Sequence, residues 1–144
     1  MNRELKFRVW NPTYQEMLYP SSPTKNGDYE EKLYLQLDGQ LMGDFKHTGL
    51  VNCSENYIIQ QFTGILDKNG KEIYEGDLID FSINNTHELG DKDIMDYKNM
   101  DVHYSEEYAG FMFGEDGFTP LDRIIMTSIE IVGNIFNTPE LIEQ

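Results

Sequence analysis

Short apolar segments separated by turn residues occupy the middle of the chain, between residues 60 and 81. The tetrapeptide DKNG at residues 67–70 is typical of a tight turn, because Asp bonds to nearby backbone and Gly accepts a positive φ. Apolar residues flank this turn on both sides, which predicts a β-hairpin. A second turn, EGD at residues 75–77, leads into a third apolar segment. The pattern predicts a compact antiparallel meander of the kind that builds small barrels.

The N-terminal part of the chain repeats this pattern more loosely. Residues 5–10 alternate apolar and polar, and residues 14–19 form the return strand of a predicted hairpin. Residues 20–28 are a polar, proline-bearing loop. Leucines at positions 33, 35 and 37 share one face of a strand before the turn Asp38-Gly39. Residues 46–54 lack a pattern, and we expect them to be irregular.

The C-terminal part contains a polar stretch between two further strand regions. Residues 84–101 fit either a solvated loop or a short acidic helix, and we favour an insertion between strands. Residues 102–113 predict another hairpin. Residues 128–136 predict a last strand, in which Gly133 marks a bulge or a close approach. Asn137, followed by Glu140 three residues later, predicts a capping box at the start of a terminal helical turn.

These elements predict a mainly β protein. We expect a small SH3-like β-barrel over residues 57–144, with a variable acidic insertion at 83–101 and a short C-terminal helical turn. Residues 1–56 form an N-terminal β-hairpin region that extends the barrel. A length of 144 residues is enough for one domain with such an extension.

The charge of the chain is strongly negative and unevenly placed. Residues 1–62 hold six basic and eight acidic side chains, for a net charge of −2, whereas residues 63–144 hold five and eighteen, for −13. Direct nucleic-acid binding is disfavoured, because such affinity comes from Lys and Arg. No apolar run approaches the length of a membrane span, and no signal segment starts the sequence. We therefore expect a cytoplasmic protein without membrane contact.

Candidate catalytic and metal-binding residues are few. His47, His87 and His103 lie in separate segments without metal-ligand spacing, so we expect neither a metal site nor a cofactor. Cys53 has no disulfide partner and is interpreted as an inert thiol. Asp77 and Asp80, near Glu75, are the remaining carboxylates that a small nucleotide-acting enzyme could use. Turn and strand-start roles explain them better, which favours a protein that is not an enzyme.

Two features remain as possible binding surfaces. Residues 75–116 contain twelve acidic side chains and two lysines, for a net charge of −10. Arranged carboxylates at this density would fit the groove of a DNA-binding protein, and unarranged ones would only solvate the surface. The exposed part of the central hairpin, Lys68, Asn69 and Lys71, is the other candidate contact surface.

Three blocks of the sequence resemble the YopX family of phage and prophage proteins. They are KFRVW at residues 6–10, the central segment at 60–79, and EIVGNIFNTPELI at 130–142. The order and spacing of the blocks make the resemblance specific, whereas residues 20–54 and 84–101 are variable segments that do not contribute to it. The resemblance implies a β-barrel-containing fold and a phage origin in a bacterial host cell. It implies no activity, cofactor or catalytic residue.

The combined expectation is a non-enzymatic, prophage-encoded accessory protein that acts through protein–protein contacts. Its expected partners are a second copy of itself and an unidentified host or phage protein. One alternative is an acidic decoy, or DNA mimic, that occupies a host nucleic-acid-binding protein. The other is the small nucleotide-acting enzyme that would use Asp77 and Asp80.

Overall fold

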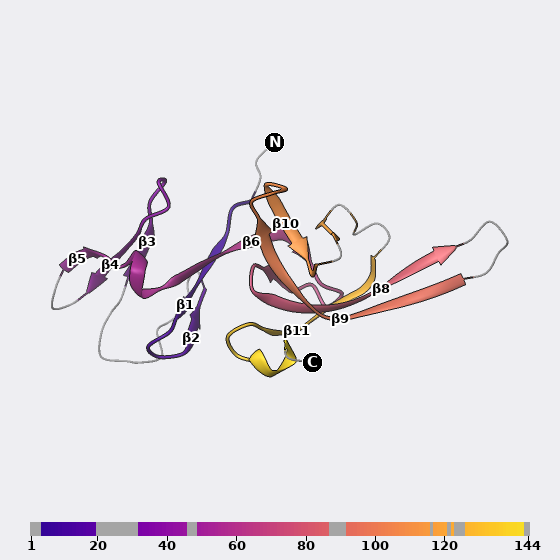
Figure 1. Ribbon diagram of the computed structural model, residues 1–144. Helices are drawn as coiled ribbons and strands as arrows, with labels where there is room; N and C mark the ends of the chain where they lie inside the picture. Colours follow the sequence, from indigo (N-terminus) through magenta and orange to yellow (C-terminus); the bar gives the residue numbers. More distant parts are fainter. Residues whose placement is uncertain are drawn as a thin grey trace. The chain divides into compact units, whose positions relative to one another are not determined.

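The computed structural model describes residues 4–19, 32–45, 49–86, 92–115, 117–120, 122 and 126–142. The chain separates into two compact units, one of residues 7–60 and one of residues 1–6 with 61–144. Each unit is built from antiparallel strands (Figure 1). The predicted mainly β class is confirmed.

The unit of residues 7–60 contains two small sheets. The first has β1 (Phe7–Asn11) between β2 (Glu16–Leu18) and the start of β6 (Ile58–Leu66). The second has the order β3 (Lys32–Leu35), β4 (Leu41–Phe45) and β5 (Gly49–Asn52). A 3-10 turn, η1 (Ser54–Asn56), follows β5. The buried side chains of this unit include Val9, Leu18, Leu41 and Cys53.

The hairpins predicted in this unit are confirmed, and one loop prediction is wrong. β1 pairs with β2, and β3 pairs with β4 across the Asp38-Gly39 turn. Residues 49–52, expected to be irregular, form β5 instead, with Val51 opposite Gly43 of β4. The strand forms because it pairs with β4, although the residues themselves have a weak propensity for β-structure. The predicted loop at residues 20–28 lies outside the described residues.

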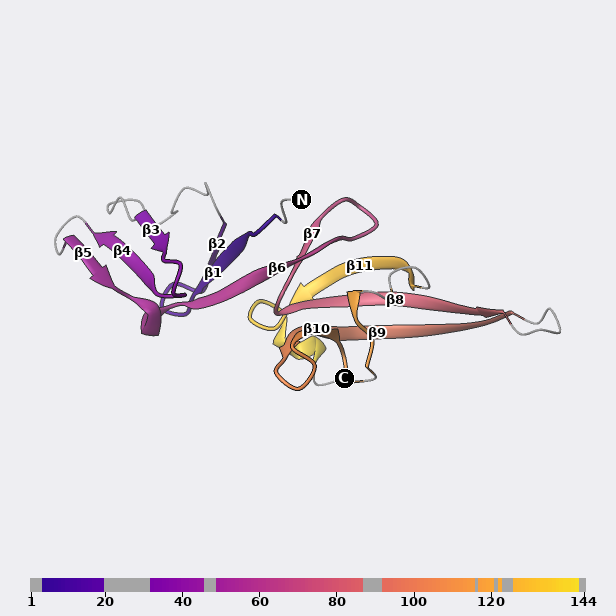
Figure 2. The ribbon, with the colours of Figure 1, turned by 90° about the horizontal axis from the view of Figure 1, so that it is seen from above.

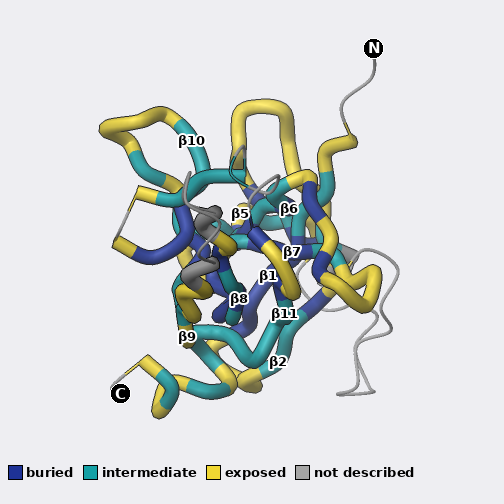
Figure 3. Tube along the Cα trace, turned by 90° about the vertical axis from the view of Figure 1, so that its right-hand side faces the viewer, coloured by how far each residue is buried: buried dark blue, intermediate teal, exposed yellow. Residues whose placement is uncertain are grey.

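The unit that contains residues 61–144 has a four-stranded sheet with further strands against it. The sheet order is β10 (Gly110–Phe113), β9 (Lys92–Ser105), β8 (Asp77–Thr86) and β11 (Met126–Asn134). The end of β6 pairs with β7 (Glu72–Tyr74) in the central hairpin. Ile65 and Ile73 of that hairpin join the sheet's apolar side chains in one core, whose other buried members are Ile79, Phe81, Ile83, Val102, Phe113, Met126 and Ile129. Figure 3 shows the exposed residues of the chain mainly in loops and hairpin tips.

The central segment forms three strands, as expected, but they do not pair as one meander. β7 pairs with β6, whereas β8 pairs with β9 and β11. The chain changes sheet at Gly76, where φ is +83° and the backbone N–H donates to the Val102 carbonyl at 2.7 Å. Leu78 and Ile79 follow and are both fully buried, so both faces of β8 are covered at this point.

The expectation of a loop or helix for residues 84–101 is wrong. β8 continues to Thr86 and β9 begins at Lys92, and the two strands stay in register to the end, with Asn84 opposite Ile94. Cross-strand hydrogen bonds can hold a polar strand whose side chains face water, which sequence alternation does not reveal. Residues 87–91 lie outside the described residues.

Closure into an SH3-like barrel remains a prediction. In the part of the chain that the structure describes, the strand order of the main sheet ends at β10 and at β11. β8, β9 and β11 are curled around the apolar core (Figure 1). The structure therefore supports the fold class at the level of a curled antiparallel sheet.

The C-terminal helical turn is confirmed, and its predicted cap is wrong. The turn is η3 (Pro139–Leu141), and its N-cap is Thr138, which makes no side-chain capping bond. The Thr138 hydroxyl instead accepts a hydrogen bond from the Asn134 N–H at 2.9 Å and donates to the Asn134 carbonyl at 3.0 Å. The bulge expected at Gly133 is present as a register shift between Ile131 and Gly133.

Candidate functional site

The predicted contact residues lie together at the tip of the β6–β7 hairpin. Lys68, Asn69 and Lys71 are all exposed there, while Asp67 is only 6% exposed. The Asp67 Oδ1 accepts hydrogen bonds from the Asn69 N–H at 2.8 Å and the Lys71 N–H at 2.9 Å. The sequence signal for a turn is thereby explained by one carboxylate that organises the tip.

The same carboxylate attaches this tip to β11. The Asp67 Oδ2 accepts the Ile131 N–H at 3.2 Å, and the Lys68 N–H donates to the Ile129 carbonyl at 2.7 Å. Burial raises the pKa of the Asp67 carboxyl, but the three backbone donors lower it more, so that the pKa lies below its ordinary value. The tip is therefore a fixed part of the fold.

One lysine side chain at the tip forms an ion pair. The Lys68 ammonium pairs with the Glu130 carboxylate at 2.9 Å, and both side chains are more than 40% exposed. Such an exposed pair contributes at most about 1 kcal/mol. The tip thus offers a small, partly basic surface, and its role as a contact surface stays a prediction.

The carboxylates considered for catalysis hold backbone groups. The Asp77 Oδ2 accepts the Tyr74 N–H at 2.8 Å, and Asp77 is 2% exposed. The Asp80 Oδ1 accepts the Asn99 N–H at 2.8 Å, and its Oδ2 lies 3.2 Å from the Lys98 ammonium. Three residues apart on a regular strand, Asp77 and Asp80 face opposite sides of β8. The structure does not bring them together as one acid–base pair.

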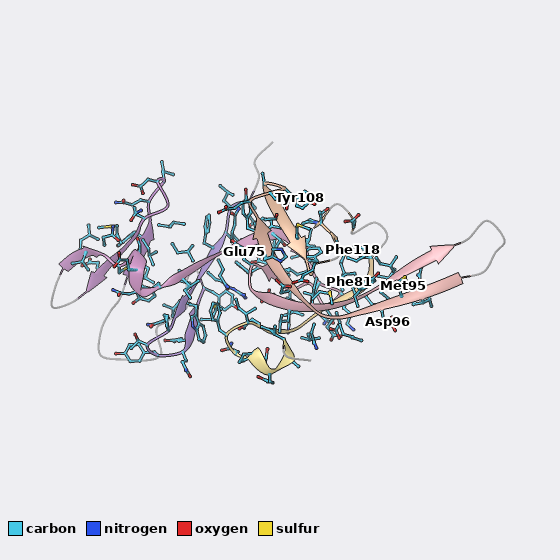
Figure 4. The ribbon with its side chains drawn as sticks, viewed as in Figure 1. Glu75, Phe81, Met95, Asp96, Tyr108 and Phe118 are labelled. Carbon is cyan, nitrogen blue, oxygen red and sulfur yellow. The ribbon has the colours of Figure 1, made fainter. Side chains whose placement is uncertain are left out.

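Glu75 also has a structural contact, because its Oε1 accepts the Gln61 N–H at 2.9 Å. Its place at the β7–β8 turn is shown in Figure 4. This bond joins the turn back to β6, so the three carboxylates singled out in the sequence each accept a backbone donor.

The remaining metal-ligand and thiol candidates are separate. His103 lies on β9, where its Nδ1 is 2.8 Å from the Asp101 Oδ2, and His47 and His87 fall outside the described residues. Within the described ranges, no group of three or more His, Cys, Asp or Glu side chains is placed to hold a metal ion. Cys53 is a buried member of the apolar cluster with Leu18 and Leu41.

An ion-pair network that the sequence did not indicate lies beside the central hairpin. The Lys6 ammonium contacts the Glu72 carboxylate and lies 2.9 Å from Glu4. The hydrogen bonds to Glu72 and Glu4 raise the pKa of Lys6, and the bond to Glu72 has the larger effect. The pKa of Glu72 is lowered first by Lys6 and then by the Tyr74 hydroxyl, which donates to Glu72 at 2.8 Å. Lys6 and Glu72 are 66 positions apart, so no local pattern reports this contact.

The most distinctive exposed feature is a two-stranded projection of the main sheet. β11 begins at Met126, opposite Ile83. Beyond this point residues 84–86 of β8 pair only with residues 92–94 of β9 among the described strands. We call this projection, together with the adjoining residues Met95 and Asp96, the β8–β9 arm; it comprises residues 84–86 and 92–96. Figures 1 and 2 show the two strands running side by side away from the rest of the sheet.

Apolar and acidic side chains are both exposed along the arm. Phe81 stacks on Tyr97 with ring centroids 5.0 Å apart, and this core face continues outward to Met95, which is 48% exposed. The opposite face carries Ile94, which is 65% exposed, and Asp96, which accepts the Ser82 hydroxyl at 2.6 Å. Figure 4 shows Met95 and Asp96 farther toward the hairpin tip than Phe81 and Phe118.

The β9–β10 hairpin is a second place where aromatic side chains face water. Tyr104 packs edge-on against its cross-strand partner Phe111, with ring centroids 5.7 Å apart. Tyr108 is exposed at the turn, beside Glu106 and Glu107. The hairpin itself was predicted from the sequence, but the exposure of its aromatic residues was not.

A family model described as "YopX protein" matches residues 6–143 of the chain. A comparison with curated proteins finds no significant match. Among solved structures, protein EF1440 from Enterococcus faecalis is 21% identical with a TM-score of 0.55, over 97% of this chain and 99% of that one. Protein yopX from Bacillus subtilis is 18% identical with a TM-score of 0.44, over 94% of this chain and 96% of that one.

The EF1440 match supports the fold described above. Neither description names an activity or a ligand. Among the described residues, no helix has the length and apolar character needed to cross a membrane.

Proposed function

This chain belongs to the YopX family, and we propose that it is a non-enzymatic accessory protein that acts through protein–protein contacts. One supporting observation is that Asp77 and Asp80 lie on opposite faces of β8 and each hold a backbone N–H. A pair of carboxylates that shares one substrate needs a common face. This arrangement favours a binding protein over the small nucleotide-acting enzyme.

The observation that carries the proposal is the exposure of large apolar side chains next to carboxylates on regular strands and a tight turn. Exposed apolar groups of this kind, rimmed by polar residues, are typical of protein contact surfaces. Two such groups lie on the main sheet among the described residues: Ile94 and Met95 with Asp96 on the arm, and Tyr104 and Tyr108 with Glu106 and Glu107 on the β9–β10 hairpin.

The proposed partners are a second copy of the chain and a host or phage protein. The family resemblance supports a prophage origin, and the bacterial cytoplasm is then the proposed place of action. Lys68, Asn69 and Lys71 remain an additional proposed contact surface, because their side chains are exposed on a tip that Asp67 keeps rigid.

The partner contact can be tested by affinity capture of the full chain in lysate from infected host cells, with bound proteins identified by mass spectrometry. We expect a partner to be recovered by the wild type and lost about tenfold with Tyr108→Ser, since exposed aromatic anchors dominate such contacts. Tyr14→Ser is the matched control, because Tyr14 is also an exposed tyrosine but lies in the other unit. Equal recovery by both variants, or no specific recovery at all, would contradict the proposed surface.

The second candidate function is an acidic decoy of a nucleic-acid-binding protein. The favouring observation is that residues 1–6 with 61–144 hold seven basic and nineteen acidic side chains, a net charge of −12 out of −15, so that one unit carries most of the charge. A basic groove would be attracted to such a unit, and salt would weaken the attraction.

The decoy is tested by asking whether captured proteins bind DNA and are released by DNA or by 0.5 M NaCl. Glu106→Gln with Glu107→Gln should weaken capture, whereas Asp44→Asn with Glu55→Gln removes the same charge from exposed positions of the other unit and should not. Capture that is insensitive to both salt and DNA would exclude this function.

A further inference from the structure

β9 has an open edge along the arm. β9 is 14 residues long, but β10 pairs only with residues 102–105, and β8 occupies the other side. On the β10 side of β9, no described strand pairs with Ile94 or Asp96. Such an open edge is a template for another strand, and natural proteins usually shorten or cover such edges.

The hydrogen bonds of Ser82 indicate which backbone groups face the open edge. The Ser82 carbonyl accepts a bond from the Thr127 hydroxyl of β11 at 3.2 Å, so it points away from β9. Ser82 and its partner Asp96 therefore form a non-hydrogen-bonded pair. Because groups alternate along a strand, the N–H and C=O of Asp96, and those of Ile94 two residues before it, point outward to the open edge.

A second copy of β9 can pair with this edge in a two-fold, antiparallel arrangement, and charge selects the register. With Ile94 opposite Ile94 of the second copy, each Asp96 lies opposite the other copy's Lys92. With Met95 at the centre, Lys92 would face Lys98, and with Asp96 at the centre, two aspartates would face each other. Opposite charges across strands stabilise a pair and like charges destabilise it.

A register centred on Tyr97 also places Asp96 opposite a lysine, but the strand does not allow it. That register would place Asp93 opposite Asp101, and it would run through Asn99, where β9 is bulged with φ of +53°. The Asp101 carbonyl already accepts the Gly114 N–H at 2.8 Å.

We propose that β9 pairs with β9 of a second copy of this chain, edge to edge and antiparallel, with Ile94 on the two-fold axis. This inference rests on the proposed function and adds the partner strand and its register. The pairing converts two projecting two-stranded arms into one four-stranded sheet. A lone two-stranded hairpin is marginally stable in water, so the pairing also stabilises each arm.

Sedimentation velocity of the full chain over a range of concentrations tests the pairing. Ile94→Pro removes the two central hydrogen bonds while sparing the bonds between β8 and β9, because the Ile94 N–H points away from β8. We expect a dimer for the wild type and a monomer for Ile94→Pro. A second comparison uses Ile94→Asp, with Leu66→Asp as its control, because Leu66 and Ile94 are both exposed strand residues. Only Ile94→Asp should dissociate the dimer.

The register is tested by a charge exchange. Asp96→Lys should weaken the dimer by about tenfold, because two attractive pairs become repulsive. The double variant Asp96→Lys with Lys92→Asp should restore the wild-type affinity to within about threefold, since the opposite pairs are re-formed.

A cysteine at the axis gives a readout that does not depend on a weakened dimer. Ile94→Cys should form an intermolecular disulfide on mild oxidation, because a hydrogen-bonded pair has a Cα separation of about 5.5 Å. Leu66→Cys should not cross-link at a comparable rate, and the native Cys53 is buried.

A monomeric wild type at high concentration, a persisting Ile94→Pro dimer, or equal cross-linking of the two cysteine variants would each overturn this inference. A monomeric wild type would also remove the second copy from the proposed partners. None of these results would affect the capture of a host or phage partner through Tyr108, so that part of the proposed function fails or stands by its own test.

Discussion

At the scale of single residues, Asp67 carries more of the fold than any turn residue of the sequence suggests. Its Oδ1 accepts hydrogen bonds from the backbone N–H groups of Asn69 and Lys71, and its Oδ2 accepts one from the Ile131 N–H. One side chain therefore holds both a local turn and a long-range contact. The turn was predictable from four adjacent residues. The bond to Ile131 was not, because it joins positions 64 apart.

Replacing Asp67 by Asn should therefore destabilise the protein by about 1–3 kcal/mol, because one amide N–H₂ group then faces a backbone donor. Chemical denaturation monitored by fluorescence measures the change in the free energy of unfolding. Asp38→Asn is the control, since the Asp38 Oδ1 accepts the Gln40 N–H at 3.1 Å in an exposed turn. A loss no larger than that of Asp38→Asn would contradict the anchoring role.

The lowered pKa of Asp67 also predicts a pH dependence. The unfolded chain binds a proton at this carboxyl more readily than the folded chain does, so stability rises with pH through this group. The contribution is complete above the ordinary Asp pKa of about 3.9 and is lost as the pH falls through the lower folded value. Denaturation at pH 7 and at successive lower pH values should show that the free energy of unfolding falls less for Asp67→Asn than for the wild type.

At the scale of elements, apolar alternation predicted the strands that border the core, and it failed where hydrogen bonding alone defines a strand. The central hairpin and the N-terminal hairpin follow their sequence patterns. β5 and the arm do not, because most of their described side chains, those of residues 49–52 and of residues 84, 94 and 95, face water. The one usable signal for the arm was the spacing of Met95 and Tyr97, which continues the core face of Phe81 and Ile83.

Gly133 provides a test at the element scale, where β11 meets the C-terminal turn. A Cβ at this position would overlap the Thr138 Oγ1 and would lie 3.2 Å from the Leu141 Cδ1. Gly133→Ala should therefore destabilise the protein by about 1–3 kcal/mol through overpacking. Thermal unfolding measures the effect. Gly110→Ala is the control, because its Cβ would meet nothing closer than 3.8 Å, and a similar melting temperature for both variants would refute the close approach.

At the scale of the whole molecule, the large negative net charge lowers stability. A chain with a net charge of −15 repels itself when it is compact. The length over which salt screens this repulsion falls from about 30 Å at 0.01 M to about 8 Å at 0.15 M ionic strength. The ion pairs at Lys68 and Lys6 are exposed or half-buried, so their screening is a small opposing effect.

We therefore expect stability at pH 7 to increase with NaCl between 0.01 and 0.3 M by about 1 kcal/mol, a rise in melting temperature of about 2–5 °C. Scanning calorimetry at several salt concentrations measures this slope. Glu106→Gln with Glu107→Gln should flatten the slope, because this pair of substitutions lowers the repulsion. A melting temperature that falls with added NaCl would contradict the expectation.

The whole fold was predictable as a class, and its sheet topology was not. Turn chemistry and alternation indicate antiparallel strands, but neither reports that β7 and β8 belong to different sheets. That division depends on Gly76, whose carbonyl accepts the Ile135 N–H at 2.8 Å and whose N–H binds Val102. Both partners are distant in sequence, and only the folded chain brings them to the turn.

The unpaired side of β9 also matters when the protein is handled in the laboratory. Strands with a free border add to one another indiscriminately when concentrated or heated, and charged residues along the border act as gatekeepers against fibril growth. Asp96 and Lys98 occupy that position here. Neutralising both at once should turn a soluble preparation into one that precipitates and binds thioflavin T, even where the native core is untouched.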